Sequence, residues 1–159
     1  MNNDTTRIGP SAEEFAERVL AASIGWAETM AIYVGDRLGW YRSLAEAGPS
    51  TAVELATRTN TSPRYAREWL EQQAVNGTLM LERAASGLAS ENRYSIAHGP
   101  AEVLTTESSL NYMAPLARMF AASAAAMPAL LDAYRSGGGV SWDQLGPDAR
   151  ESQADLNRP

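Results

Sequence analysis

The chain contains no cysteine and a single histidine, and these absences remove several classes of function. Without cysteine it forms no disulfide and has no thiol nucleophile. His98 alone cannot supply the cluster of ligands that a metal site needs, and no serine nucleophile motif accompanies it. Because His98 lies beside Gly99-Pro100 at a break in the chain, we assign it to a turn or a cap. We therefore expect no metal site and no catalytic residue in this chain.

The chain also lacks a run of about eighteen apolar residues, which a membrane-spanning helix needs, and its polar N-terminus holds no apolar signal-peptide core. We expect a cytoplasmic protein without a membrane partner. All 13 basic residues are arginine, which is typical of a GC-rich bacterial genome. The net charge of −6 argues against nucleic acid or an anionic membrane as a partner.

The segment from Pro49 to Ile96 has the pattern of a winged helix-turn-helix. Thr51 and Glu54 form a capping box, in which each side chain satisfies a backbone N–H at the start of a short helix. After a polar break, Pro63 opens a second helix that ends at Asn76-Gly77. Two strand-like runs, TLMLE and NRYSI, then predict a β-hairpin that forms the wing.

A long apolar helix precedes the winged helix. A capping box of Ser11 and Glu14 predicts its start, and it runs toward Gly35. Glu28 is the one charged residue between positions 21 and 34, so this helix is apolar on more than one face. We expect it to be covered on several sides by this chain or by a second copy.

Two more apolar helical runs follow the wing, at residues 111–126 and 128–136, and Pro128 divides them. Both are rich in alanine and methionine and carry little charge, so neither has enough polar residues for a helix that faces water. The predicted fold class is mainly α: a winged helix-turn-helix with a small β-hairpin wing and additional flanking helices.

The predicted domain organisation has three parts. Residues 1–10 are expected to be a disordered tail. Residues 11–136 form the winged-helix and dimerisation domain with its flanking helices, in which the helix-turn-helix and wing occupy 50–97. Residues 137–159, which begin with three glycines and are polar and turn-rich, are expected to be a linker toward a catalytic domain that is absent from the sequence.

Methionine and aromatic side chains on the flanking helices are candidates for a small-molecule pocket, because such side chains line adaptable apolar sites. The candidates are Met30, Tyr33, Tyr112, Met113, Met119 and Phe120. Their helical spacing fits ordinary core or a dimer interface about as well, so both interpretations stay open. Trp26, Trp40 and Trp69 are expected in the core or an interface.

Winged helices often bind DNA, and Arg64 and Arg67 on the second helix are the candidate contacts. The segment from Pro49 to His98 holds five arginines and five glutamates, so it is neutral. Glu68 and Glu71 offset the two candidate arginines, whereas DNA binding normally relies on a local basic excess. DNA binding is therefore not the favoured function.

The chain resembles the amino-terminal part of bacterial class I S-adenosylmethionine-dependent methyltransferases that carry a winged helix ahead of a Rossmann-like catalytic domain. The matching phrases are DRLGWYRSLAEAGPSTAVELATRTNTSPRYAREWLEQQAVNGTL, RYSIAHGPAEVLT, NYMAPLARM, YRSGGGVSWDQLG and QADLNRP. TRTN departs from the pattern, with Asn60 in place of the more usual glycine, and asparagine also tolerates a left-handed backbone. The resemblance implies a winged helix turned from DNA binding to dimerisation and to covering the substrate.

The resemblance also implies a cofactor site that this sequence does not contain. In such enzymes a strand and a glycine-rich loop come next and bind S-adenosylmethionine. We therefore expect the chain alone to bind no cofactor and to be inactive, while the parent enzyme uses S-adenosylmethionine and a small-molecule methyl acceptor. A homodimer is the expected assembly. The alternative is a free-standing winged-helix transcriptional regulator.

Overall fold

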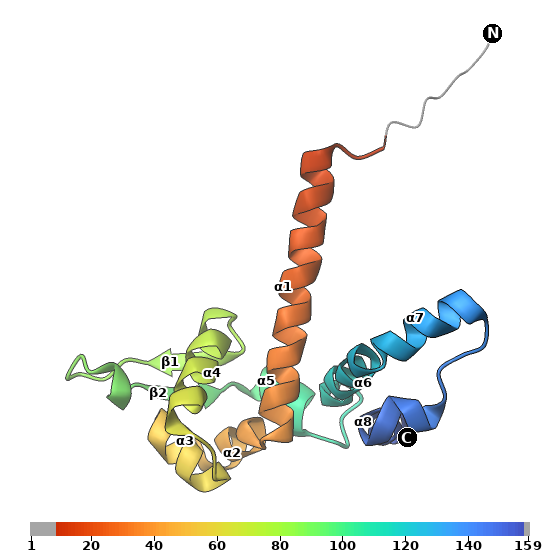
Figure 1. Ribbon diagram of the computed structural model, residues 1–159. Coiled ribbons are helices and arrows are strands. Elements are labelled where there is room, and N and C mark those ends of the chain that lie inside the picture. The colour runs from red at the N-terminus through yellow and green to blue at the C-terminus, as the bar shows by residue number, and fades with distance from the viewer. Residues whose placement is uncertain (1–8, 158–159) are drawn as a thin grey trace.

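Helix α1 (Ala12–Arg37) is 26 residues long in the computed structural model, which describes residues 9–157. It starts at the predicted capping box, in which the backbone N–H of Ser11 donates to Glu14 and that of Glu14 donates to Ser11. The first half of α1 projects away from the other elements, and the second half packs between the winged helix and the later helices (Figure 1). The tail expected at residues 1–10 lies, as far as residue 8, outside the described residues.

The predicted winged helix-turn-helix is confirmed between residues 50 and 96. It consists of α3 (Ala52–Thr59), α4 (Pro63–Val75), β1 (Leu79–Glu82), a short 3-10 turn (Ala89–Glu91) and β2 (Arg93–Ile96), and α2 (Trp40–Ala47) precedes it. The strands pair antiparallel with Leu81 opposite Tyr94, and Ser50 adds a further bridge to Tyr94. Helices α3 and α4 meet across a tight turn, and the hairpin extends away from them as the wing (Figure 1).

The local signals of the winged helix act as the sequence predicts. The backbone N–H of Glu54 donates to the Thr51 hydroxyl at 3.2 Å, and that of Thr51 donates to Glu54 at 2.8 Å. Asn60 has a positive φ of 52° and ends α3, which is why an asparagine suffices where a glycine is more usual. Pro63 is the first residue of α4, where a missing N–H costs nothing.

Large aromatic side chains fill the core of the winged helix. Trp40 and Trp69 have ring centroids 4.8 Å apart, and Tyr41 packs edge-on against Trp69 at 5.0 Å. The Trp69 indole N–H also donates to the Ala31 carbonyl at 2.9 Å, which fastens α4 to the second half of α1. Gly35 permits this approach, since a Cβ there would lie 2.3 Å from the Trp69 ring.

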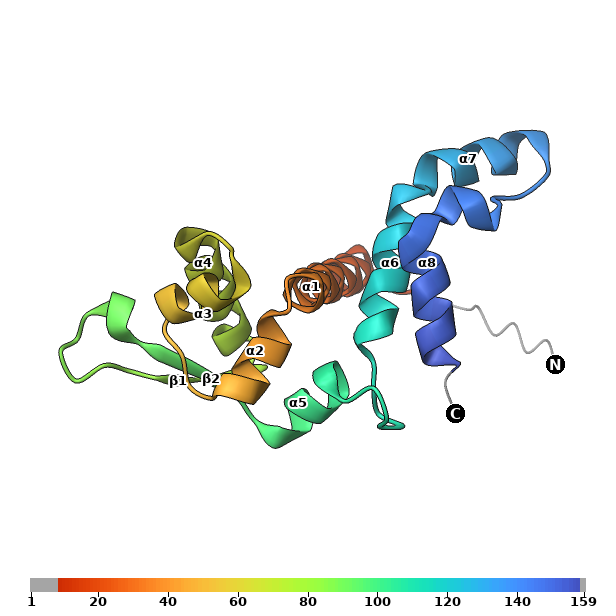
Figure 2. The same ribbon diagram turned by 90° about the horizontal axis from the view of Figure 1, so that it is seen from below.

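Four helices follow the wing: α5 (His98–Thr105), α6 (Ala114–Ala125), α7 (Met127–Ser136) and α8 (Trp142–Leu156). His98 is therefore the first residue of α5. Helices α6 and α7 correspond to the two predicted runs and bend by 57° where they meet. Helices α6 and α8 lie side by side (Figure 2). The two helices carry small buried residues, namely Ala114, Ala117, Ala122, Ala149 and Ser152.

Residues 137–159, which the sequence suggests are a polar, turn-rich linker, contain helix α8. Ser141 and Gln144 form a third capping box, which starts a helix over residues 142–156. Gly146 and Pro147, which suggest turns in the sequence, instead produce a break within α8, where Gly146 adopts a φ of 79°. Most of this segment is therefore helical rather than turn-rich.

Within residues 9–157 no single helix is long and apolar enough to cross a membrane, although the bent pair of α6 and α7 meets the same length and composition criteria together.

Candidate functional site

A cluster of buried charges joins α1, α6 and α8. Arg118 of α6 lies with its Nε 3.1 Å from Asp36 Oδ2 of α1 and its Nη1 2.8 Å from Asp155 Oδ2 of α8. The exposed fractions of these three side chains are 8%, 3% and 15%, so we call these contacts the inner ion pairs. Arg118 also donates to the Tyr112 hydroxyl at 3.3 Å, and Arg42 lies 3.6 Å from Asp36.

A second group of charges lies nearer the surface, between α1 and the part of α8 that follows the break at Gly146. Arg37 contacts Asp148, and its Nη2 lies 2.9 Å from Glu151 Oε2. We call these contacts the outer ion pairs. The Tyr33 hydroxyl donates to Asp148 at 2.7 Å, and this hydrogen bond raises the pKa of Tyr33. Acidic residues of α8 thus accept the hydrogen bonds that Tyr33 and Arg37 of α1 donate.

The first half of α1 has no covering element. Every residue from 12 to 28 is exposed, including large apolar side chains whose exposed fractions range from 44% to 61%: Phe15, Val19, Leu20, Ile24 and Trp26. The predicted apolar character of this helix is present, but the described chain does not cover it. We call residues 12–28 the apolar arm.

Helices α6 and α7 present a second exposed apolar surface. It comprises Leu116, Phe120, Met127, Leu130, Leu131 and Tyr134. Helix α7 has no buried residue at all in the structure. Exposed apolar surface on this scale is uncommon on a soluble monomer and usually marks a contact site.

The six predicted pocket residues do not line one cavity. Tyr112 lines a cavity of about 110 Å³ together with Glu107 and Asp155. Met30 and Met119 are half-buried, while Met113 and Phe120 are 46% and 49% exposed. Tyr33 uses its hydroxyl on Asp148 rather than pointing it into a cavity. A pocket made by these residues therefore remains a prediction that depends on a further covering surface.

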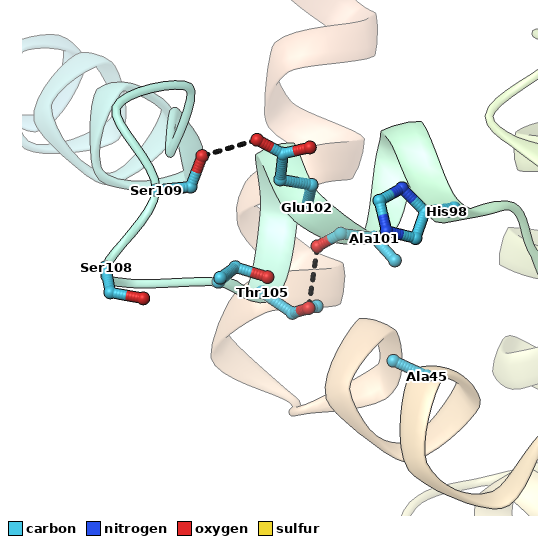
Figure 3. A pocket seen from close by; sticks show the side chains of 8 residues that line it. Ala45, His98, Ala101, Glu102, Thr105, Ser108 and Ser109 are labelled. Carbon is cyan, nitrogen blue, oxygen red and sulfur yellow. Dashed lines mark hydrogen bonds between the residues drawn. The ribbon is translucent and has the colours of Figure 1, made fainter.

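A larger cavity, of about 570 Å³, opens between α2, α5 and the turn that follows α5 (Figure 3). Its polar lining includes His98, Glu102 and Ser109. Glu102 accepts hydrogen bonds from Ser109 at 2.6 Å and Asn111 at 3.0 Å, and these lower the pKa of its carboxyl group. Within residues 9–157 no cluster of three potential metal ligands occurs, here or elsewhere.

The candidate DNA contacts on α4 are paired with acids one helical turn away. Arg64 lies 3.1 Å from Glu68, and Arg67 lies 3.9 Å from Glu71. These pairs leave the exposed face of α4 without a local excess of positive charge, whereas a DNA-reading helix normally has one.

Sequence reasoning missed the ion pairs that hold the later helices together. Arg118 carried the available signal, because it is the one charged residue between positions 111 and 126 of an otherwise apolar segment. A charge in such a segment needs a buried partner. The partners Asp36 and Asp155 lie far away in the sequence, so no local pattern identifies them.

Comparison with protein families identifies the winged helix. A family model described as the Rv2258c-like winged HTH domain matches residues 26–106. This span is about half of the chain and runs from the middle of α1 to just beyond α5. No curated protein matches the chain.

Several solved methyltransferase structures share the fold. Human N-acetylserotonin methyltransferase, solved in complex with SAM, is 23% identical, has a TM-score of 0.66 and aligns over 95% of this chain and 43% of its own. RosA, a riboflavin-derivative dimethyltransferase from Streptomyces davawensis, is 20% identical, with a TM-score of 0.68 over 93% and 44%. The mitomycin 7-O-methyltransferase MmcR is 27% identical, with a TM-score of 0.64 over 93% and 45%. The chain spans less than half the length of each.

Proposed function

The chain belongs to the Rv2258c-like winged HTH domain family, and we propose that it is the dimerisation and substrate-covering domain of an S-adenosylmethionine-dependent methyltransferase. The likeness to methyltransferase structures supports this class of parent enzyme. Because the chain aligns with less than half of each structure, the cofactor site and the small-molecule methyl acceptor site belong to the parent enzyme in this proposal. The chain alone binds no S-adenosylmethionine and transfers no methyl group.

The exposed apolar arm is the observation that carries the dimerisation part of the proposal. Packing of an apolar face supplies most of the stability of a helix in a protein. The arm holds large apolar side chains on more than one face, and nothing in residues 9–157 covers them. Covering them recovers roughly 25 cal/mol per Å² of apolar surface, less the cost of association.

In this proposal, a second copy of the chain covers the side chains of the apolar arm. Each copy offers both an apolar arm and the exposed surface of α6 and α7, so a two-fold assembly satisfies both copies with the same contacts. The surface of α6 and α7 includes Phe120, which was predicted to line a pocket. In the substrate-covering part of the proposal, the substrate lies between this chain and the catalytic domain of the parent enzyme.

Sedimentation equilibrium tests the assembly. We expect a dimer at tens of micromolar, and a monomer with unchanged helix content when Leu20→Asp and Ile24→Asp are combined. Leu110→Asp is the matched control, because Leu110 is 94% exposed in the turn before α6 and lies outside the arm. This control should stay dimeric. A soluble wild-type monomer at the same concentration would contradict the dimerisation part of the proposal.

Calorimetry tests whether the S-adenosylmethionine site lies outside this chain. We expect no measurable heat on titrating the chain with S-adenosylmethionine. Micromolar affinity would instead place a cofactor site in these residues and overturn this part of the proposal.

A free-standing regulator is the second candidate, and the helix-turn-helix itself is the feature that favours it. The ion pairs of Arg64 and Arg67 argue against it. A steeply salt-dependent shift on DNA that disappears in the double variant Arg64→Ala, Arg67→Ala would restore this function.

A further inference from the structure

A cavity of about 340 Å³ lies between the C-terminal end of α4 and the wing. We propose that this cavity, which we call the wing site, binds a small molecule with an apolar body and one carboxylate group. The wing and α4 lie on the opposite side of α1 from α6, α7 and α8 (Figures 1 and 2). The wing site is therefore separate from the exposed surface of α6 and α7, and it does not depend on the proposed dimer.

Apolar side chains form much of the wall of the wing site. Ala74 and Val75 line it from α4, and Leu81 and Ala89 line it from the hairpin. Val75 and Leu81 are 87% and 39% exposed, so a bound ligand removes apolar surface of both residues from water, which is favourable. Small-molecule sites have volumes of about 300 to about 1,000 Å³, so the cavity suits a ligand at the small end of this range.

Hydrogen bonds hold the hairpin side of the wing site in place. Tyr94, which lines the cavity, is 2% exposed, and its backbone exchanges hydrogen bonds of 2.8 and 2.9 Å with that of Ser50. The side-chain carbonyl of Asn92, another lining residue, accepts from the Ala84 N–H at 3.1 Å. This contact leaves the Asn92 amide N–H groups as donors. A wall that is already ordered reduces the entropy that binding costs.

The charges around the wing site favour an anionic ligand. Glu71 and Arg83 are the two charged residues that line it. Glu71 lies 3.9 Å from Arg67 on the same helix, which offsets its negative charge. Arg83 forms no ion pair within the part of the chain that the structure describes. Burial raises the pKa of Tyr94, and Arg67 and Arg83 both act to lower it, so both positive charges lie close to the cavity wall.

These groups together select the chemistry of the ligand. The Arg83 guanidinium offers paired N–H donors that match the two oxygens of a carboxylate, and Asn92 supplies a further N–H donor. The apolar body of the ligand lies against Val75 and Leu81. A neutral amide of the same shape lacks the charge-assisted hydrogen bonds, and an ammonium group is repelled by Arg83. The affinity should therefore fall from carboxylate to amide to amine.

Chemical-shift titration of the whole chain by NMR tests the wing site. The probes are 3-phenylpropionate, 3-phenylpropionamide and 3-phenylpropylamine, which share one apolar body and differ in charge. We expect 3-phenylpropionate to cause saturable shifts at the methyl groups of Val75, Leu81 and Ala89. Its affinity should exceed that of the amide by about ten-fold, as for one hydrogen bond to a charged group, and the amine should bind more weakly than the amide.

Variants of the two ends of the wing site separate charge recognition from apolar contact. Arg83→Gln should weaken the binding of 3-phenylpropionate by about ten-fold and leave that of the amide unchanged, so that the two probes bind alike. Arg64→Gln is the matched control, because Arg64 is an exposed arginine of α4 outside the cavity, and it should change neither affinity. Val75→Ser should weaken both probes equally, and the exposure of Val75 leaves the fold intact.

Several results of the same titrations would overturn the proposal. Shifts that do not saturate, or equal affinity for the three probes, would exclude a site for a carboxylate. Shifts confined to the apolar arm and to α6 and α7 would show that the probes cover exposed apolar surface instead. A preference for the carboxylate that persists in Arg83→Gln would assign anion binding to another part of the molecule.

Discussion

The winged helix and the pair of helices α6 and α8 bury their contacts with different kinds of residue. The winged helix closes around Trp40, Tyr41 and Trp69, which bury large apolar surfaces. The buried residues of α6 and α8 are mostly small, namely alanines and a serine, and the Arg118 guanidinium of α6 lies between Asp36 of α1 and Asp155 of α8. Small side chains let helices approach closely but bury little apolar area. The pair of α6 and α8 therefore depends on charge pairing and on a further covering surface, whereas the winged helix does not.

The largest expected effect tests the aromatic side of this contrast. Trp69→Ala leaves a cavity between α2 and α4 and removes the hydrogen bond to Ala31, so we expect unfolding to become easier by about 4 kcal/mol. Trp142→Ala is the control, because Trp142 is 53% exposed, and it should change stability little. Urea denaturation followed by circular dichroism measures both. Equal effects of the two substitutions on the free energy of unfolding would show that the winged helix does not depend on its buried aromatic side chains.

The next effect tests the charged side. Arg118→Ala leaves Asp36 and Asp155 buried without their shared partner, and we expect a loss of about 3 kcal/mol, since Arg42 still lies near Asp36. The same change at the exposed Arg64 should cost less than about 1 kcal/mol. Urea denaturation again provides the measurement. A negligible effect of Arg118→Ala would mean that apolar packing alone holds α6 and α8 together.

A smaller effect is expected where the two regions meet. Gly35→Ala places a methyl group 2.3 Å from the Trp69 ring and 2.6 Å from the Tyr41 ring, and the resulting overpacking should destabilise the protein by about 2 kcal/mol. Gly25→Ala in the same helix meets nothing within 4 Å and should be neutral or stabilising, because alanine favours helices. Thermal unfolding of the two variants distinguishes them. Similar melting temperatures would show that α1 is not closely packed on the winged helix.

The smallest effect concerns alkaline pH. Burial, with a contribution from the nearby Asp36 charge, raises the pKa of Tyr41 above its ordinary value of 10.0. The folded state therefore holds this proton more tightly than the unfolded state, and the stabilisation is complete below pH 10 and lost as the pH rises further. Urea denaturation at about pH 8 and about pH 11 should show this loss. In Tyr41→Phe the free energy of unfolding should change less between these two pH values. An equal change in the wild type and the variant would assign the pH dependence to other groups.

The winged helix was predictable because local residues specify it. The capping pair of Thr51 and Glu54, Pro63 at the start of α4 and Gly77 at its end act through neighbours in the sequence. The resemblance to the amino-terminal part of methyltransferases is confirmed by the family match and the shared fold.

Helix α8 was not predictable in the same way. Gly146, Pro147 and the polar residues around them suggest turns, while the helix depends on contacts with α6 and on Arg37 and Arg118. Arg118 is 37 positions from Asp155, and Arg37 is 114 positions from Glu151. The candidate pocket residues were placed on the expected helices, but helical periodicity cannot say whether Met30 and Phe120 share a cavity or an interface.

Hydrogen exchange in the apolar arm, measured across protein concentrations from below one micromolar to tens of micromolar, tests the proposed assembly most directly. The arm has no covering element within residues 9–157, so its amides should exchange freely in a monomer. We predict that the amides of residues 16–28 become protected as the concentration rises, together with those of α6 and α7, while those of the winged-helix core stay protected throughout. Fast exchange in the arm at every concentration would contradict the account.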